Sequence, residues 1–170
     1  MATVNTYAMT QARQFGNVPF GNDSLLPFTL TVNASGIALN TDQATALQIG
    51  DVVRLGIIPG GFQPWDCKVV ISTAMAAATT YKLGFLYTDG VDSTAVPQND
   101  AYFVPATTSA ATAAILSKSA TTAPVVLPKN AYLVLTLAGA AQTGASQLDV
   151  VVEGIHTGDI VGSLGSMQNP

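Results

Sequence analysis

Residues 50–70, GDVVRLGIIPGGFQPWDCKVV, carry two mainly apolar segments on either side of a Pro-Gly-Gly turn. In both segments apolar residues recur at every second position, which is the spacing of β-strands with one buried face. Proline and consecutive glycines favour a tight connection, because proline fixes its φ angle and glycine accepts positive φ. The stretch therefore predicts two β-strands joined by a Pro/Gly turn, with Asp51, Arg54 and Lys68 as polar exceptions.

The same alternation returns along most of the chain. It is clearest in residues 26–32, 81–87, 131–138 and 147–155, and weaker in residues 35–40, 100–104 and 123–128. Turn-forming residues separate these segments, so we expect an all-β chain, an antiparallel β-sandwich or jelly roll of about 7–9 short strands. Domain organisation is predicted as an N-terminal arm (1–25), a sandwich (26–156) and a flexible C-terminal tail (157–170).

Two segments lack clear alternation. Residues 41–49 begin with a helix-capping threonine and could form a short helical turn. Residues 107–122 are rich in alanine, which favours helix, but their serines and threonines compete for backbone hydrogen bonds. We expect this second segment to be a long loop with one helical turn at most.

Charge is scarce in this chain. Charged residues make up 9% of its 170 residues, the net charge is −4, and the mean hydropathy is +0.38. No apolar run reaches the ~20 residues needed to span a bilayer as a helix, so no membrane association is expected. Six scattered basic residues make no phosphate-binding patch, which argues against direct nucleic-acid binding. The low charge suits a surface that is largely covered by neighbouring proteins.

Catalytic residues are not evident. One histidine, His156, and one cysteine, Cys67, cannot build a Ser-His-Asp triad or a multi-histidine metal site. We interpret His156 as a polar residue at a strand end and Cys67 as a small buried residue. Asp89, Asp92 and Asp100 could hold a hard cation, but aspartates are common in turns because they bond to the backbone. The chain is therefore expected to have no cofactor and no metal and not to be an enzyme.

Aromatic residues are the remaining candidates for recognition. Trp65 and several tyrosines could stack on sugars, but aromatic side chains in strands are more often core or interface anchors. We expect Trp65 to be substantially buried, in the core or at a subunit contact. The candidate interface residues are Tyr7, Phe15, Phe62, Trp65, Tyr102 and Phe103.

The order of several short motifs adds a resemblance. GDVVRL runs into IPGG, and YKLGFLYTDGVDS, NDAYFV and AYLVLTLAGAAQTGASQLDVVV follow in that order. Over residues 50–155 this succession resembles the capsid cement or decoration proteins of tailed bacteriophages, which have jelly-roll or related β-sandwich folds. Such proteins have no catalytic residues to carry over.

The resemblance implies a structural protein of the virion. Such a protein is made in the host cytoplasm and binds the outer capsid surface at junctions between major capsid protein subunits. It usually does so as a dimer or trimer, and it stabilises the shell. The alternative is a carbohydrate-binding or adhesion module of a phage tail or head fibre, and a hydrolase using His156, Asp89 and Asp92 ranks third.

Overall fold

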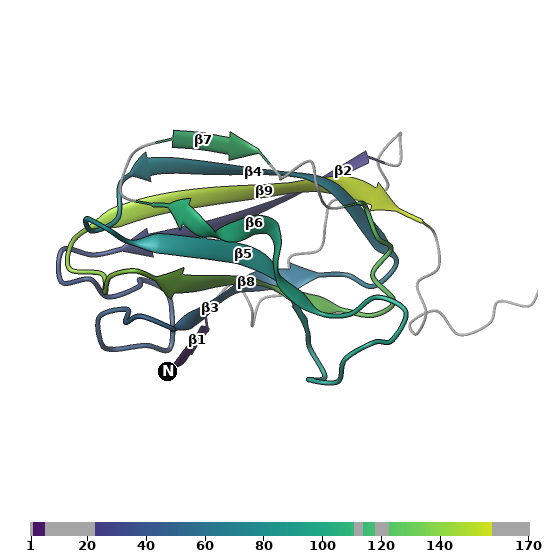
Figure 1. Cartoon of the computed structure of the whole chain (residues 1–170), viewed down its shortest axis with the longest axis horizontal. Coiled ribbons are helices and arrows are strands. Elements are labelled where there is room, and N and C mark those ends of the chain that lie inside the picture. The colour runs from purple at the N-terminus through teal and green to yellow at the C-terminus, as the bar shows by residue number, and fades with distance from the viewer. Residues whose placement is uncertain (1, 6–22, 111–113, 118–122, 158–170) are drawn as a thin grey trace, which may run out of the picture.

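The computed structural model describes residues 2–5, 23–110, 114–117 and 123–157, which form two β-sheets (Figure 1). The five-stranded sheet has the order β1 (Thr3–Asn5), β3 (Val52–Ile58), β8 (Ala131–Ala138), β5 (Thr80–Tyr87) and β6 (Asn99–Ser109). The four-stranded sheet has the order β2 (Asp23–Val32), β9 (Ser146–His156), β4 (Phe62–Thr73) and β7 (Ala114–Ser117). Apart from the parallel β1–β3 pair, neighbouring strands are antiparallel. The predicted all-β sandwich is confirmed.

The turn at residues 59–61 joins the two sheets. Its flanking strands, β3 and β4, do not pair with each other but lie in different sheets. The Gly61 amide donates to the Leu127 carbonyl at 2.7 Å, and the Gly60 amide donates to Asn130 Oδ1 at 2.8 Å. Gly61 has a φ of 78°, which favours glycine. The 50–70 stretch therefore carries the chain from one layer of the sandwich to the other.

The core lies between the sheets and is filled by every second residue of the strands. On β8 and β9 the inward positions hold leucine and valine almost throughout. Aromatic rings cluster where β5 meets β6: the Phe85 and Tyr102 ring centroids are 5.3 Å apart, and those of Tyr102 and Phe103 are 4.9 Å apart, both edge-to-face. Such contacts add to the free energy of burying the rings.

The described parts of residues 107–122 differ from the predicted loop, and residues 111–113 and 118–122 lie outside the described part of the chain. β6 continues to Ser109, and Ala114–Ser117 form β7, which pairs with Lys68–Ile71 of β4. The open edge of β4 offers backbone partners, and this tertiary pairing overrides the helix preference of alanine. No helix occurs in the described residues, and residues 41–49 instead make turns and an isolated bridge between Ile37 and Ala46. Accordingly, no described helix is long and apolar enough to cross a membrane.

The described residues near the two ends of the chain can be compared with the predicted N-terminal arm and C-terminal tail. Thr3–Asn5 form the edge strand β1 beside β3, and Val4 is buried in the core. β2 begins at Asp23, three residues before the predicted start of the sandwich. Residues 6–22 and 158–170, which make up most of the predicted arm and tail, lie outside the described part of the chain.

The burial of Tyr81 makes the free energy of unfolding depend on pH in the alkaline range. Its hydroxyl is buried and has no hydrogen-bond partner among the described residues, and burial raises the pKa of Tyr81 far above the usual 10.0. Burial also raises the pKa of Tyr87 and of Tyr102. Above a pH of about 10 the unfolded chain loses these protons while the folded chain keeps them, so the free energy of unfolding falls as pH rises.

In the Tyr81→Phe variant we expect the free energy of unfolding to fall less steeply with rising pH than in wild type. At pH 7 the variant should be as stable as wild type or about 1 kcal/mol more stable, because it removes an unsatisfied buried hydroxyl. Urea unfolding followed by circular dichroism at several values between about pH 8 and 11 measures both effects. A variant whose stability falls as steeply as that of wild type would contradict the assignment to Tyr81.

Candidate interaction surfaces

Three of the predicted interface residues are core residues. Phe62, Tyr102 and Phe103 are all buried between the sheets. The Phe62 ring packs on Gly154, and the Tyr102 hydroxyl donates to the Ala123 carbonyl at 3.0 Å. The expectation that these three side chains contact a partner is therefore corrected, since they stabilise the sandwich instead. Tyr7 and Phe15 lie outside the described residues.

Trp65 lies at the surface. It is 38% exposed and sits at a bulge in β4, where Pro64 pairs with Gly154 and Asp66 already pairs with Glu153. The extra residue of a bulge is left unpaired and redirects side chains locally. The prediction that Trp65 is buried in the core of this chain is therefore wrong, and its burial at a subunit contact stays a prediction.

Apolar side chains gather near Trp65 on the outer face of the four-stranded sheet. Leu25 is 59% exposed, and it pairs across the sheet with Glu153, as Pro27 pairs with Val151. Diagonal neighbours on one face of a sheet lie within side-chain contact range, so these residues are contiguous. We call this group the outer patch: Leu25, Pro27, Trp65, Val151 and Ile155.

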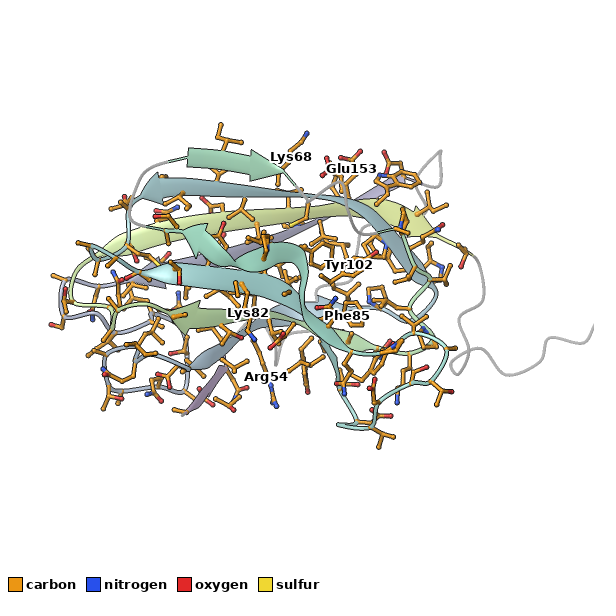
Figure 2. All side chains as sticks on the ribbon, in the orientation of Figure 1. Arg54, Lys68, Lys82, Phe85, Tyr102 and Glu153 are labelled. Atoms are coloured by element: carbon orange, nitrogen blue, oxygen red, sulfur yellow. The ribbon has the colours of Figure 1, made fainter. Side chains whose placement is uncertain are left out.

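A carboxylate lies at the centre of the outer patch. Glu153 is half-buried and is flanked by Leu25 on β2 and by the Trp65 bulge on β4. Figure 2 shows Glu153 and Lys68 on the side of the sheet that faces away from the five-stranded sheet. The outward positions of this sheet carry four carboxylates against one lysine: Asp23, Asp66, Asp149, Glu153 and Lys68.

The outer face of the five-stranded sheet has the opposite character. Lys82 makes an ion pair with Asp100 at 2.5 Å, and the Arg54 guanidinium lies 4.6 Å from the centroid of the Tyr132 ring. Figure 2 shows Arg54 and Lys82 on this second sheet. Its cationic side chains are therefore already engaged within the chain.

The loop between β5 and β6, residues 88–98, projects beyond the sheets in Figure 1. The Lys129 ammonium donates to Asp89 and to the Val91 carbonyl, both at 2.7 Å, and the bond from Lys129 lowers the pKa of Asp89. Asp92 accepts the amides of Ser93 at 2.8 Å and Gln98 at 2.7 Å. The loop is thus held by its own side chains and presents Val91 to solvent.

The three carboxylates of the possible cation site, Asp89, Asp92 and Asp100, have separate partners. Asp89 pairs with Lys129, Asp100 pairs with Lys82, and Asp92 caps the backbone of its own loop. Across the part of the chain that the structure describes, no three His, Cys, Asp or Glu side chains come together in a way that could hold a metal ion. The backbone-bonding interpretation of Asp92 is confirmed.

The two residues with reactive side chains have structural surroundings. Cys67 is buried between the sheets, as predicted, whereas its neighbour Lys68 points outward. His156 closes β9, with its Nε2 3.1 Å from the Gly60 carbonyl oxygen, so it helps to hold the turn between the sheets. The prediction of a polar residue at a strand end is confirmed for His156.

A shared sugar-stacking platform is not formed by the described aromatics. Tyr81, Tyr87 and Tyr102 are buried, and the Tyr132 ring lies under Arg54 on the five-stranded sheet. Trp65 is exposed on the other sheet. These rings therefore do not present a common exposed face to a glycan.

Comparisons with known proteins give matches of fold alone. No protein-family model and no curated protein matches the sequence. A chain in the capsid of Ralstonia phage GP4 is similar with a TM-score of 0.62 and 13% identity, over 91% of this chain and 97% of that one. A chain in the capsid asymmetric unit of cyanophage Pam1 has a TM-score of 0.54 and 14% identity, over 86% of this chain and 94% of that one. The likeness thus extends over nearly the whole of each chain.

Proposed function

We propose that this chain is a cement or decoration protein of a tailed bacteriophage. In this role it binds the outer surface of the capsid at junctions between major capsid protein subunits and stabilises the shell. The observation that carries the proposal is the fold likeness to chains of two phage capsids, which spans 97% and 94% of those chains. The likeness supports a structural role in the virion, in keeping with the motif order in residues 50–155.

The surface of the chain supports the same role. Large apolar side chains such as Leu25, Trp65 and Ile115 are exposed, and charged residues make up only 9% of the sequence. Exposed apolar groups that lie together mark contact sites. A protein that binds only the assembled shell lowers the free energy of that shell by mass action, and a symmetric lattice repeats the effect.

The proposed role is structural and needs no catalytic group. Its partners are the major capsid protein and further copies of this chain, as a dimer or trimer. Its location is the outer surface of the virion, after synthesis in the host cytoplasm. The structural contacts of His156, Cys67 and Asp92 support a non-enzymatic role, because each of these side chains has a place in the fold.

Co-sedimentation with capsids tests the proposal. Purified protein is mixed with expanded and with unexpanded empty capsids of the phage that encodes it, and the pellets are quantified. We expect saturable binding at a fixed ratio to the major capsid protein, and a higher melting temperature of the decorated shell. An unrelated acidic protein of similar mass is the control. No binding to either capsid form would refute the proposal, and a few copies per particle would indicate a tail or vertex component instead.

A further inference from the structure

We infer that the outer patch is the face that docks on the capsid, and that its partner is a protein surface carrying arginine or lysine among apolar side chains. This inference rests on the proposed function and adds to it the docking face and the chemistry of the partner. It is carried by a half-buried carboxylate, Glu153, that lies among exposed apolar residues of the four-stranded sheet.

The apolar part of the face is suited to burial. Leu25 on β2 and Trp65 on β4 lie on either side of the β9 residue Glu153 and are 59% and 38% exposed. Pro27 on β2 and its pairing partner Val151 on β9 extend the surface along these strands. Tryptophan in such a setting is a frequent anchor of protein contacts, because it buries a large rigid surface at little cost in conformational entropy. The paired strands beneath keep these side chains in place before binding.

The charge of the face selects the partner. Burial of Glu153 against an apolar surface would strip its carboxylate of water, and a desolvated charge is tolerated only when it is paired and hydrogen-bonded. Neither ion pair found among the described residues involves Glu153. Among the described residues, three further carboxylates share this sheet face with one lysine, so the face attracts a cationic partner. Arginine suits the position best because its planar group binds a carboxylate through two hydrogen bonds.

The same charge argues against other occupants. In a two-fold dimer formed through this face, Glu153 and Asp66 would face the like-charged groups of the second copy. Nucleic acids and anionic lipids would be repelled. The outer face of the five-stranded sheet is a weaker candidate, because Lys82 and Arg54 already have partners within the chain.

Five variants test the inference in the co-sedimentation assay with purified empty capsids. Leu25→Ser, Glu153→Lys and Glu153→Gln change the outer patch and the carboxylate at its centre. On the outer face of the five-stranded sheet, Ile57→Ser is the matched control for Leu25→Ser, and Asp100→Asn is the matched control for Glu153→Gln. Circular dichroism and urea unfolding verify that all five fold like wild type, as expected for exposed or half-buried positions.

We expect Leu25→Ser and Glu153→Lys each to weaken capsid binding by at least about tenfold, while both controls stay within about twofold of wild type. Glu153→Gln, which keeps the shape but not the charge, should also weaken binding. Raising the salt concentration should weaken the binding of wild type more than that of Glu153→Gln, because screening acts on the charge pair.

The outcomes separate this inference from the proposed function. If wild type does not bind capsids, both are overturned. If wild type binds and the patch variants bind as well as the controls, the docking face is wrong while the cement role stands. Unchanged or tighter binding by Glu153→Lys would overturn the cationic partner. If Leu25→Ser dissociates a homo-oligomer in sedimentation velocity but still binds capsids, the patch belongs to a second copy and the inference fails.

Discussion

Phe85→Ala is expected to lower the free energy of unfolding by about 3–5 kcal/mol, the usual cost of removing a large aromatic ring from a core. Phe85 is buried between the sheets, and its ring packs edge-to-face on Tyr102 and at 5.8 Å from the Tyr87 centroid (Figure 2). The truncation leaves a cavity and removes both ring contacts. Because domains are stable by only about 5–15 kcal/mol, the variant should be near its folding limit.

Urea unfolding and thermal melting measure this loss. For a domain of this size we expect the melting temperature to fall by about 6–20 °C. Val91→Ala is the control, because Val91 is 61% exposed in the loop between β5 and β6 and its truncation should change stability by less than about 0.5 kcal/mol. Equal melting temperatures for the two variants would show that the ring cluster does not stabilise the core.

Gly84→Ala should be the second most damaging change, at about 3 kcal/mol. A Cβ atom at Gly84 would lie 2.1 Å from the Asn99 carbonyl oxygen and 2.4 Å from the Asp100 carbonyl carbon. Both atoms belong to the backbone of β6, which cannot rotate away as a side chain would. The first residues of β6 must therefore shift, and the ion pair between Lys82 and Asp100 is expected to break with them.

Gly144→Ala provides the matched control. A Cβ atom there meets nothing within 4 Å, so this variant should be as stable as wild type or slightly more stable. Hydrogen exchange adds a local measurement, in which the amides at the start of β6 should exchange faster in Gly84→Ala and stay protected in Gly144→Ala. Equal protection in the two variants would contradict a backbone clash at Gly84.

The strands that the sequence predicted best are those with uninterrupted alternation. Residues 131–138 coincide with β8, and residues 147–155 lie within β9 (Ser146–His156). Both strands are flanked by paired neighbours in their sheets, so the pattern of alternate apolar residues directly reflects their burial. β7 could not be predicted in this way, because its pairing depends on the edge of β4, which is more than 40 residues earlier in the chain.

The errors at the candidate interface have a common cause. Regular alternation would place consecutive residues on opposite faces and bring one of Tyr102 and Phe103 to the surface. Both are buried, because the register of β6 shifts: Leu83 pairs with Val104 but Phe85 already pairs with Asn99. The exposure of Trp65 likewise follows from a bulge in β4, which the sequence pattern did not predict. The outer patch, however, follows from alternation in β9, which places Val151, Glu153 and Ile155 on one face.

The pairing of β2 with β9 has a consequence for how the chain is made. Phe28 pairs with Val150 and Leu30 with Leu148, so β2 finds its partner more than 100 residues later in the sequence. At a synthesis rate of about 5–20 residues per second, β2 waits roughly 6–24 s on the ribosome before β9 exists. During that interval its apolar face has no sheet to join, and such long-range pairing also makes folding slow. Assembly of the four-stranded sheet therefore requires that the nascent β2 does not aggregate, so the risk of aggregation is greatest during synthesis.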